Sequence, residues 1–293
     1  TGTAIQRCVN LKEVYCPTSL RRLASFDQVT NLFWEKPLEI RNKVCVVTGA
    51  ASGIGRAMAK RFAAAGARGI VVADIQEGPL KSVADEIGGH AVSGDMTSEA
   101  DVQALIKTAE DKFGDIDIFC SNAGIIRLGG EDAPNDEWQL CWDLHLMAHV
   151  YAARDLAPKM AARGDGYLVN TASAAGLLSH VNSATYTVTK HAAVAFAEWI
   201  SINYGNQGVK VSVLCPQAVK TAMTEGCEGG AAHVDGMITP EALAESVIDT
   251  TAREEFLILP HAEVLDYMRR KTEDYGRWLG GMRKFKERFP EGI

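Results

Sequence analysis

The sequence predicts an α/β fold with a doubly wound, seven-stranded parallel sheet and helices on both faces. Short runs rich in Val and Ile alternate with Ala-rich helical stretches along most of the chain. These runs are mostly apolar on both faces, as strands of a buried parallel sheet are. The first run leads into a glycine-rich turn, "TGAASGIGRA", at the start of a helical stretch. Such alternation specifies an open sheet whose ligand crevice lies beyond the carboxyl ends of the strands.

Each element follows from its own stretch of sequence. The expected strands are 43–48, 69–74, 90–95, 115–121, 166–172, 209–215 and 256–260. The expected helices are 53–65, 79–87, 98–113, 136–162, 184–205 and 240–252. This pattern predicts three parts, namely an N-terminal extension (1–42), a doubly wound domain (43–260) and a helical C-terminal tail (261–293).

The tail contains apolar residues at intervals of three and four, which predicts one mostly apolar helical stripe. The residues of this stripe are Leu265, Met268, Thr272, Tyr275, Leu279 and Met282. Three partners for the stripe remain open: the protein's own surface, a neighbouring subunit or the mouth of the ligand pocket.

Composition excludes several classes of function. Of 293 residues, 47% are hydrophobic and 23% are charged, which is typical of a soluble globular protein. The net charge of −7 provides no broad basic field for nucleic acid. The apolar runs are far shorter than the ~20 residues that span a membrane, and the first 25 residues lack a signal-peptide pattern. Seven scattered cysteines without a CxxC pair favour reduced thiols, so we expect a cytoplasmic enzyme.

The glycine-rich turn contains Gly49, Gly53 and Gly55. Glycines let the backbone approach a pyrophosphate, and the following helix N-terminus offers unpaired N–H groups. The next strand ends in Asp74, where a carboxylate can accept hydrogen bonds from both ribose hydroxyls. A turn with close helix packing and a helix cap at Asp74 are the alternatives, but the order strand, loop, helix, strand and acid favours a dinucleotide site.

A second motif combines Ser173, Tyr186 and Lys190. Tyr186 and Lys190 are four apart on an expected helix, so they share a face and the ammonium should lower the phenol's pKa from about 10. Ser173 follows the fifth strand, where its hydroxyl can orient a substrate oxygen. The thirteen-position interval and the glycine turn favour catalysis over a chance surface pair.

These motifs, with "SNAG" at 121–124, resemble the short-chain dehydrogenase/reductase (SDR) family, and in particular bacterial NAD-dependent members of unspecified substrate. The resemblance implies a Rossmann fold, a homotetramer or other homo-oligomer, and hydride transfer between NAD(H) and a secondary alcohol or ketone with Tyr186 as general acid/base. No metal, nucleic-acid or membrane partner is implied. The implied cofactor-binding residues are Gly49, Ser52, Gly53, Ile54, Gly55, Asp74, Ile75, Asp95, Met96, Asn122, Ala123, Gly124, Tyr186, Lys190, Pro216, Val219 and Thr221.

Two positions depart from the family pattern. Gln217 replaces a glycine after Pro216, and His145 replaces an asparagine that holds a water in the proton relay from the catalytic lysine. We expect His145 to join Ser173, Tyr186 and Lys190 in catalysis and, because imidazole titrates near pKa ~6.5, to give the relay a pH dependence. The alternative is that only the backbone carbonyl of this residue holds the water. His149 lies four residues further on, but no third ligand accompanies the pair, so we expect no metal.

The substrate is not named by any motif. The small-residue segment after Thr221 fits either a mobile lid or a plain loop, and its length favours a substrate larger than ethanol. Two functions of other classes remain as alternatives: an isomerase or lyase that uses the dinucleotide transiently, and a non-catalytic NAD sensor.

Overall fold

The sheet is the centre of the structure, a computed structural model that describes residues 39–226 and 229–291. Its seven strands are parallel and run in the order β3-β2-β1-β4-β5-β6-β7. Their bounds are β1 Val44–Thr48, β2 Gly69–Asp74, β3 His90–Ser93, β4 Ile118–Ser121, β5 Gly166–Thr171, β6 Val209–Leu214 and β7 Leu257–Ile258. The predicted doubly wound sheet is therefore confirmed. Because the order reverses between β1 and β4, a crevice opens between their carboxyl ends.

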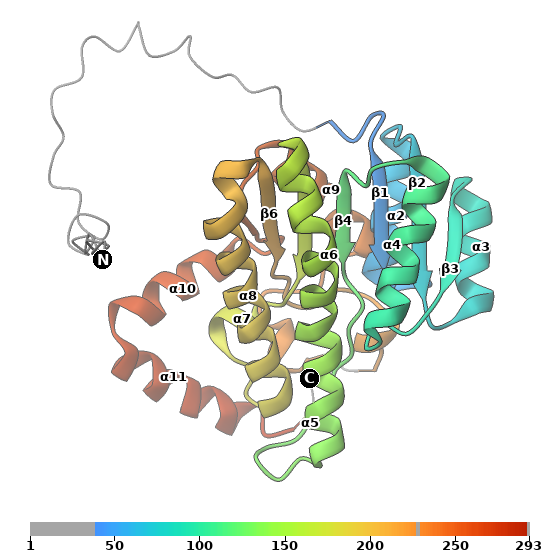
Figure 1. Cartoon of the computed structure of the whole chain (residues 1–293). Helices are drawn as coiled ribbons and strands as arrows, with labels where there is room; N and C mark the ends of the chain where they lie inside the picture. Colours follow the sequence, from blue (N-terminus) through green and yellow to red (C-terminus); the bar gives the residue numbers. More distant parts are fainter. Residues whose placement is uncertain (1–38, 227–228, 292–293) are drawn as a thin grey trace, which may run out of the picture. The chain divides into compact units, whose positions relative to one another are not determined.

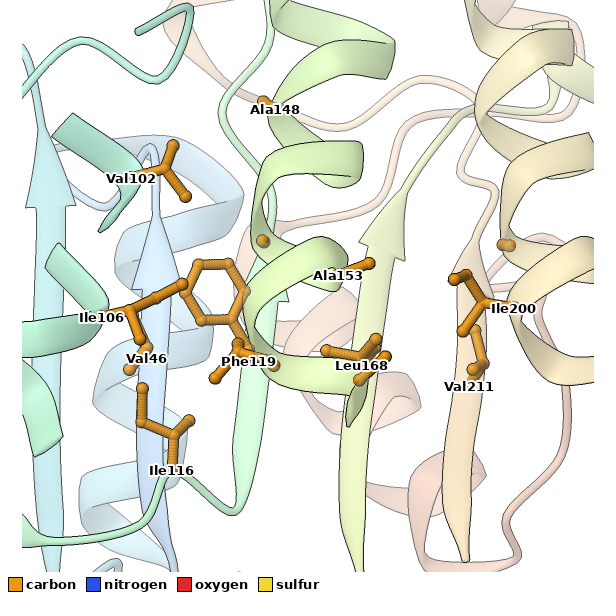
Figure 2. Close-up of a cluster of buried hydrophobic side chains, with 14 of the residues drawn as sticks. Val46, Val102, Ile106, Ile116, Phe119, Ala148, Ala153, Leu168, Ile200 and Val211 are labelled. Atoms are coloured by element: carbon orange, nitrogen blue, oxygen red, sulfur yellow. The ribbon is translucent and has the colours of Figure 1, made fainter. Parts of the chain in front are cut away.

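Helices cover both faces of this sheet (Figure 1). Their bounds are α2 Gly53–Ala64, α3 Glu77–Ile87, α4 Glu99–Phe113, α5 Asn135–Trp142, α6 Ala148–Arg163, α7 Ala175–Leu178, α8 Ala184–Tyr204, α9 Pro240–Ala252, α10 Glu263–Glu273 and α11 Tyr275–Arg288. Side chains alternate across β1, so that Val46 faces the layer of α4, α6 and α8 while Val47 faces the layer of α2, α3 and α9. Figure 2 shows Phe119 and Leu168 in the first of these two cores.

One predicted helix is interrupted. Instead of a single helix over 136–162, α5 and α6 are separated by a π-helical segment, Asp143–Met147. The N–H of Ala148 donates to the carbonyl of Asp143, five residues earlier, so the segment holds one residue more than an α-helical turn allows. The sequence pattern does not reveal this insertion, because the residues of 143–147 are of types that an ordinary helix also contains.

The C-terminal tail forms two helices rather than one continuous stripe. Asp274 ends α10 and caps α11 by accepting a 2.9 Å hydrogen bond from the N–H of Arg277. Because the break reorients the second helix, the expected stripe is only partly correct: Leu265, Tyr275 and Leu279 are exposed, whereas Met268 and Met282 are half-buried. Val264 and the rings of Tyr267 and Trp278 pack instead around α7, together with Met268.

The described residues report on two further expectations. None of their helices is both long enough and apolar enough to cross a membrane. Cys45, Cys120, Cys141 and Cys215 are buried and free. Of the expected N-terminal extension, residues 1–38 lie outside the described residues.

Candidate functional site

A large cleft, about 1230 Å³ in volume, lies at the carboxyl ends of the strands. It is lined by every site residue expected from the sequence except His145. The glycine turn, the two strand-end acids and the Ser173, Tyr186 and Lys190 group therefore share one concave surface. His145 lies directly behind that surface, with its ring 5.4 Å from the ring of Tyr186.

The glycine turn leaves no room for side chains. Gly49 has a φ of +65° and Gly53 a φ of +52°, values that favour glycine. A Cβ at Gly55 would lie 2.2 Å from the carbonyl oxygen of Gly49, so the helix can approach β1 only through glycine. Ser52, at the N-cap of α2, makes no side-chain cap bond. The first N–H groups of α2 accordingly face a cleft shaped for a pyrophosphate.

Asp74 ends β2 beside this turn. Its two carboxylate oxygens accept 3.0 Å hydrogen bonds from the N–H groups of Ala51 and Gln76. These bonds fix the carboxylate at the rim of the cleft, where its remaining lone pairs can accept ribose hydroxyls. The adjacent Ile75 is 68% exposed and supplies no positive charge. The local structure thus suits a ribose without a 2′-phosphate.

Asn122 joins three strands at the switch point. Its side-chain amide donates to the carbonyl of Thr48 at 3.0 Å, and its side-chain oxygen accepts from the hydroxyl of Thr171 at 3.1 Å. The Thr48 hydroxyl accepts from the Asn122 N–H at 2.9 Å. These bonds hold the ends of β1, β4 and β5 together. Asp95 instead accepts from the N–H of Thr97 at 2.9 Å, in the turn that leads to α4.

Ser173 is positioned by an extension of the β5–β6 pairing. The N–H of Ala174 donates to the carbonyl of Pro216 at 2.9 Å, which places the two loops side by side. The Ser173 hydroxyl accepts from the Ala175 N–H at 3.1 Å and lies 3.4 Å from the Pro216 carbonyl. The hydroxyl is therefore held at the bottom of the cleft, next to the loop that contains Val219 and Thr221.

Tyr186 and Lys190 come from the first two turns of α8. Ser183 caps this helix by accepting a 3.0 Å bond from the Tyr186 N–H. The buried Lys190 ammonium donates to the Thr171 carbonyl at 3.0 Å and lies 5.5 Å from the centre of the Tyr186 ring. The three residues named in the motif thus converge from β5 and α8.

The electrostatics of this group differ from the sequence expectation. Burial raises the pKa of Tyr186, and a hydrogen-bonding interaction with Ser173 partly opposes the rise. Burial also lowers the pKa of Lys190 to about 8. The expected lowering of the phenol's pKa by Lys190 is therefore wrong for the cofactor-free protein, because burial disfavours the charged phenolate and is the largest cause of the shift.

His145 is fully buried in the π-helical segment. Its Nε2 accepts the N–H of Ile125 at 3.2 Å, which places the ring proton on Nδ1. Nδ1 then donates to the Thr189 hydroxyl at 2.9 Å, and that hydroxyl donates to the Thr185 carbonyl at 2.8 Å. Burial, followed by the charge of Lys190, holds the pKa of His145 well below its usual range. The expectation that this imidazole titrates in the working range is therefore wrong.

His149 follows one turn later and is also buried. Neither of its ring nitrogens has a hydrogen-bond partner among the described residues. Burial lowers its pKa to about 3. Within the described ranges, no group of three His, Cys, Asp or Glu side chains is arranged to hold a metal ion.

Gln217, the departure after Pro216, has a definite structural role. Its side-chain amide donates to Asp235 at 2.9 Å, and the hydroxyl of Tyr267 donates to the other oxygen of the same carboxylate at 2.8 Å. The Gln217 N–H also donates to Nδ1 of His261 at 3.3 Å. We call the three side chains Gln217, Asp235 and Tyr267 the latch, because they join the loop after β6, the segment 222–238 and helix α10.

Sequence reasoning missed a second set of lining residues. They belong to α10, α11 and the loop before α8: Tyr267, Arg270, Glu273, Arg277, Trp278, Gly281, Met282, Phe285, Arg288, His180 and Val181. The apolar stripe of the C-terminal tail was the available signal, since the mouth of the ligand pocket was one of the three partners considered for that stripe. His180 carries a buried Nε2 that has no partner among the described residues.

The residues present fit a nicotinamide dinucleotide. The glycine turn provides a cradle that any Cβ would fill, the Asp74 carboxylate lies beside it at the rim of the cleft, and the loop with Val219 and Thr221 borders the same cleft. A Cβ on Gly53 would lie 3.1 Å from the methyl group of Thr221, so the glycine turn and this loop approach each other closely. The cleft is thus continuous from the phosphate cradle to Ser173 and Tyr186.

Comparisons with known proteins agree with this geometry. A family model described as short chain dehydrogenase matches residues 43–229. A 1-deoxy-11-beta-hydroxypentalenate dehydrogenase of Streptomyces exfoliatus is 34% identical over 250 residues, covering 82% of this chain and 90% of that protein. Epidermal retinol dehydrogenase 2 of Homo sapiens is 30% identical over 233 residues, covering 75% of each. A solved short chain dehydrogenase/reductase from Burkholderia phymatum in complex with NAD has a TM-score of 0.74 and 30% identity, and the match covers 82% of this chain and 96% of that one.

Proposed function

This chain belongs to the short-chain dehydrogenase family and is an oxidoreductase, and from that premise we propose that it transfers a hydride between NAD(H) and a secondary alcohol or ketone. The observation that carries the proposal is the convergence of Ser173, Tyr186 and Lys190 in the cleft that also contains the glycine turn. We expect the substrate to be larger than ethanol, because the cleft around Tyr186 is extensive.

Each residue of the group has a role that its contacts support. Tyr186 takes the hydroxyl proton in oxidation and returns it in reduction. Ser173, fixed beside the Pro216 carbonyl, donates to the substrate oxygen. Lys190, anchored on the Thr171 carbonyl, keeps a positive charge near the phenol. His145 acts behind the site as a positioning residue, since its bonds to Ile125 and Thr189 connect the loop after β4 to α8.

NAD is the cofactor that the residues favour. When bound, NAD⁺ supplies the hydride acceptor and a second positive charge that offsets the burial of Tyr186. Gly49, Gly53, Gly55 and Asp74 hold its adenosine half, and the remaining residues expected from the resemblance complete the binding surface. Asp74 disfavours the 2′-phosphate of NADP through charge repulsion.

The experiment is a panel of secondary alcohols and hydroxysteroids with NAD, read by the absorbance of reduced cofactor. Tyr186→Phe keeps the ring but removes the titrating oxygen, so turnover should fall by about 10²–10⁴ while NAD affinity stays similar. Tyr275→Phe, on the exposed surface of α11, is the matched control. Undiminished turnover in Tyr186→Phe would remove this residue from the mechanism. An isomerase or lyase would convert substrate without net formation of NADH, and a sensor would bind NAD without either change.

The assembly and location proposed here are a homo-oligomer, specifically a homotetramer, in the cytoplasm. An exposed apolar face of α8 supports self-association: Val188 is 45% exposed, Trp199 53% and Ile202 78%. These residues are separated by eleven and three positions, which places them on one side of the helix. The dehydrogenase domain is proposed to span 43–260, with 1–42 and 261–293 as extensions.

A further inference from the structure

His180 lines the cleft beside Tyr186. It belongs to the loop between α7 and α8, and its ring centre lies 6.2 Å from the centre of the Tyr186 ring, with the two ring planes at 77°. The imidazole and the phenol are therefore neighbours in the wall of the cleft. A ligand whose hydroxyl group meets Tyr186 has His180 next to it.

The backbone of His180 is fixed to α8. Its N–H donates to the Thr187 hydroxyl at 2.8 Å, and its carbonyl accepts from the same hydroxyl at 3.1 Å. Thr187 directly follows Tyr186 in the helix. These two bonds restrict the movement of the imidazole relative to the phenol, so His180 is held in place before any ligand binds.

One nitrogen of the imidazole is used within the loop. The N–H of Asn182 donates to Nδ1 of His180 at 3.2 Å. A ring nitrogen that accepts a hydrogen bond carries no proton, so the proton of the neutral imidazole lies on Nε2. Burial, followed by the charge of Lys286, lowers the pKa of His180 and so favours this neutral form. Nε2 is therefore a hydrogen-bond donor, at the end of the ring furthest from the backbone.

This donor has no acceptor among the residues that the structure describes, although Nε2 is buried. The nearby Lys286 cannot serve, because an ammonium group only donates, and it does so to the Asn182 side-chain oxygen and the Pro290 carbonyl. A buried donor without an acceptor is unfavourable, and native proteins seldom leave one unpaired. In a residue that lines a ligand cleft, this points to an acceptor that belongs to the ligand.

The reacting oxygen of an alcohol is already provided for. In the proposed function, Ser173 donates to that oxygen and Tyr186 exchanges its proton, so the Nε2 donor is left for a different atom. Much of the remaining lining is apolar, and includes Leu140, Leu178, Val181, Met223, Met282 and Phe285. Such a site holds a mainly apolar ligand by a few well-placed polar contacts.

We propose that the substrate carries a second oxygen close to its alcohol group, and that Nε2 of His180 donates a hydrogen bond to this oxygen. This inference rests on the proposed function, since it takes Ser173 and Tyr186 to bind the reacting oxygen. Because Nε2 donates, the second oxygen is an acceptor such as a ketone carbonyl. The substrate class is thus a bulky, mainly apolar hydroxy ketone. His180 determines specificity and takes no part in hydride transfer.

The test uses pairs of bicyclic secondary alcohols that differ only in a ring ketone in place of a methylene group. One pair has the ketone beside the carbinol carbon, and the other has it across the ring. The ratio of kcat/KM with NAD, hydroxy ketone over plain alcohol, is compared between enzyme and variants, so that the intrinsic reactivity of the two alcohols cancels. His180→Phe keeps a ring against Tyr186 but has no donor. Its ratio should fall by about tenfold or more for at least one pair, through a higher KM for the hydroxy ketone.

His180→Gln is the conservative variant, because its amide nitrogen can take the place of Nε2. Both variants lose Nδ1 and its bond from Asn182, so the donor is what distinguishes them. His180→Gln should keep most of the ratio. Val181→Ala is the control for a change in cleft shape, and it should affect both alcohols of a pair alike. The proposal is overturned if His180→Phe leaves the ratio unchanged, or if His180→Gln or Val181→Ala lowers it equally.

Binding provides a readout that does not need turnover. In the Tyr186→Phe background with NADH, where oxidation and reduction are both suppressed, calorimetric titration should show tighter binding of the hydroxy ketone than of the plain alcohol. Adding His180→Phe should remove this difference and leave NADH affinity unchanged. If no alcohol is oxidised by the unaltered enzyme but the difference is present, the proposed function fails while the His180 contact stands. If alcohols are oxidised but no hydroxy ketone binds more tightly, the contact fails alone.

Discussion

The hydroxyl of Tyr267 donates a 2.8 Å hydrogen bond to Asp235 and so ties helix α10 to the segment between Thr221 and Ile238. Burial, followed by the bond to Asp235, raises the pKa of this phenol to about 12, so the hydroxyl remains a donor at alkaline pH. The same carboxylate accepts from Gln217, two residues before Val219. The segment between Thr221 and Ile238, the loop after β6 and the C-terminal tail therefore share one polar contact.

We predict that Tyr267→Phe loosens the segment 222–238. The substitution leaves one oxygen of Asp235 without its donor, which should cost about 1–3 kcal/mol of local stability. Amide hydrogen exchange in this segment should accelerate, and KM for the alcohol should rise more than kcat changes. Tyr275→Phe should change neither quantity. Unaltered exchange in Tyr267→Phe would show that the latch does not hold the segment.

A second prediction concerns the choice of dinucleotide. Because Asp74 stands at the rim of the glycine turn and Ile75 supplies no positive charge, kcat/KM with NAD should exceed that with NADP. Asp74→Ala should narrow this preference, whereas Asp85→Ala, which removes an exposed carboxylate from α3, should leave it intact. Equal or better efficiency of the unaltered enzyme with NADP would contradict the assignment.

The third prediction concerns His145. Since its pKa lies well below the usual range, the imidazole stays neutral throughout the working range and contributes no step to the acid side of the pH–rate profile. Profiles of the unaltered enzyme and of His145→Asn should have the same shape from about pH 5.5 to 8. Loss of the bonds to Ile125 and Thr189 should lower the free energy of unfolding by about 1–3 kcal/mol. If the pH–rate profile of His145→Asn were shifted from that of the unaltered enzyme, His145 would have to titrate within the working range.

Stability at acid pH yields a fourth prediction, from His149. Its folded pKa of about 3 lies below the ordinary value of 6.5, so the unfolded chain binds the proton first as pH falls. The contribution of neutral His149 is therefore present above pH 6.5 and is lost as pH falls toward the folded pKa, at up to about 1.4 kcal/mol per pH unit. Urea unfolding at several pH values should show a shallower loss for His149→Leu. Parallel curves would contradict the assignment.

The fifth prediction addresses assembly. If the exposed apolar face of α8 is a subunit interface, Trp199→Glu with Ile202→Glu should dissociate the oligomer, because burial of two new charges is strongly unfavourable. Light scattering after gel filtration should then report a smaller mass. Glu198→Lys is the control for a charge change elsewhere on the exposed surface of α8, and the mass of this variant should stay that of the oligomer. An unchanged mass in the double variant would place the interface elsewhere.

Much of this architecture could be predicted because its signals are local. The strands are short apolar runs, and the glycine turn and the pair Tyr186 and Lys190 are recognisable by their spacing together with their place after a strand and after Ser173. The features that escaped prediction depend on contacts between distant residues. The bond from Gln217 to Asp235 spans eighteen positions of unremarkable sequence, and the neutral state of His145 follows from its burial and its bond to Ile125. In the sequence, Asp274 is an ordinary polar residue within a helical pattern, and nothing marks it as the end of α10 and the cap of α11.

The π-helical segment at Asp143–Met147 contains one residue more than a regular helical turn, and this extra residue sets the orientation of α5 relative to α6. Each residue of an α-helix advances the chain by about 100° around its axis. Deleting one residue from the segment would restore a regular helix and turn α5 by that angle relative to α6. Leu140, which lines the cleft, would then point elsewhere, and the buried Cys141 would turn with it. One residue at this point of the chain therefore sets which side of α5 lines the cleft, together with the burial of Cys141 and the contacts of His145.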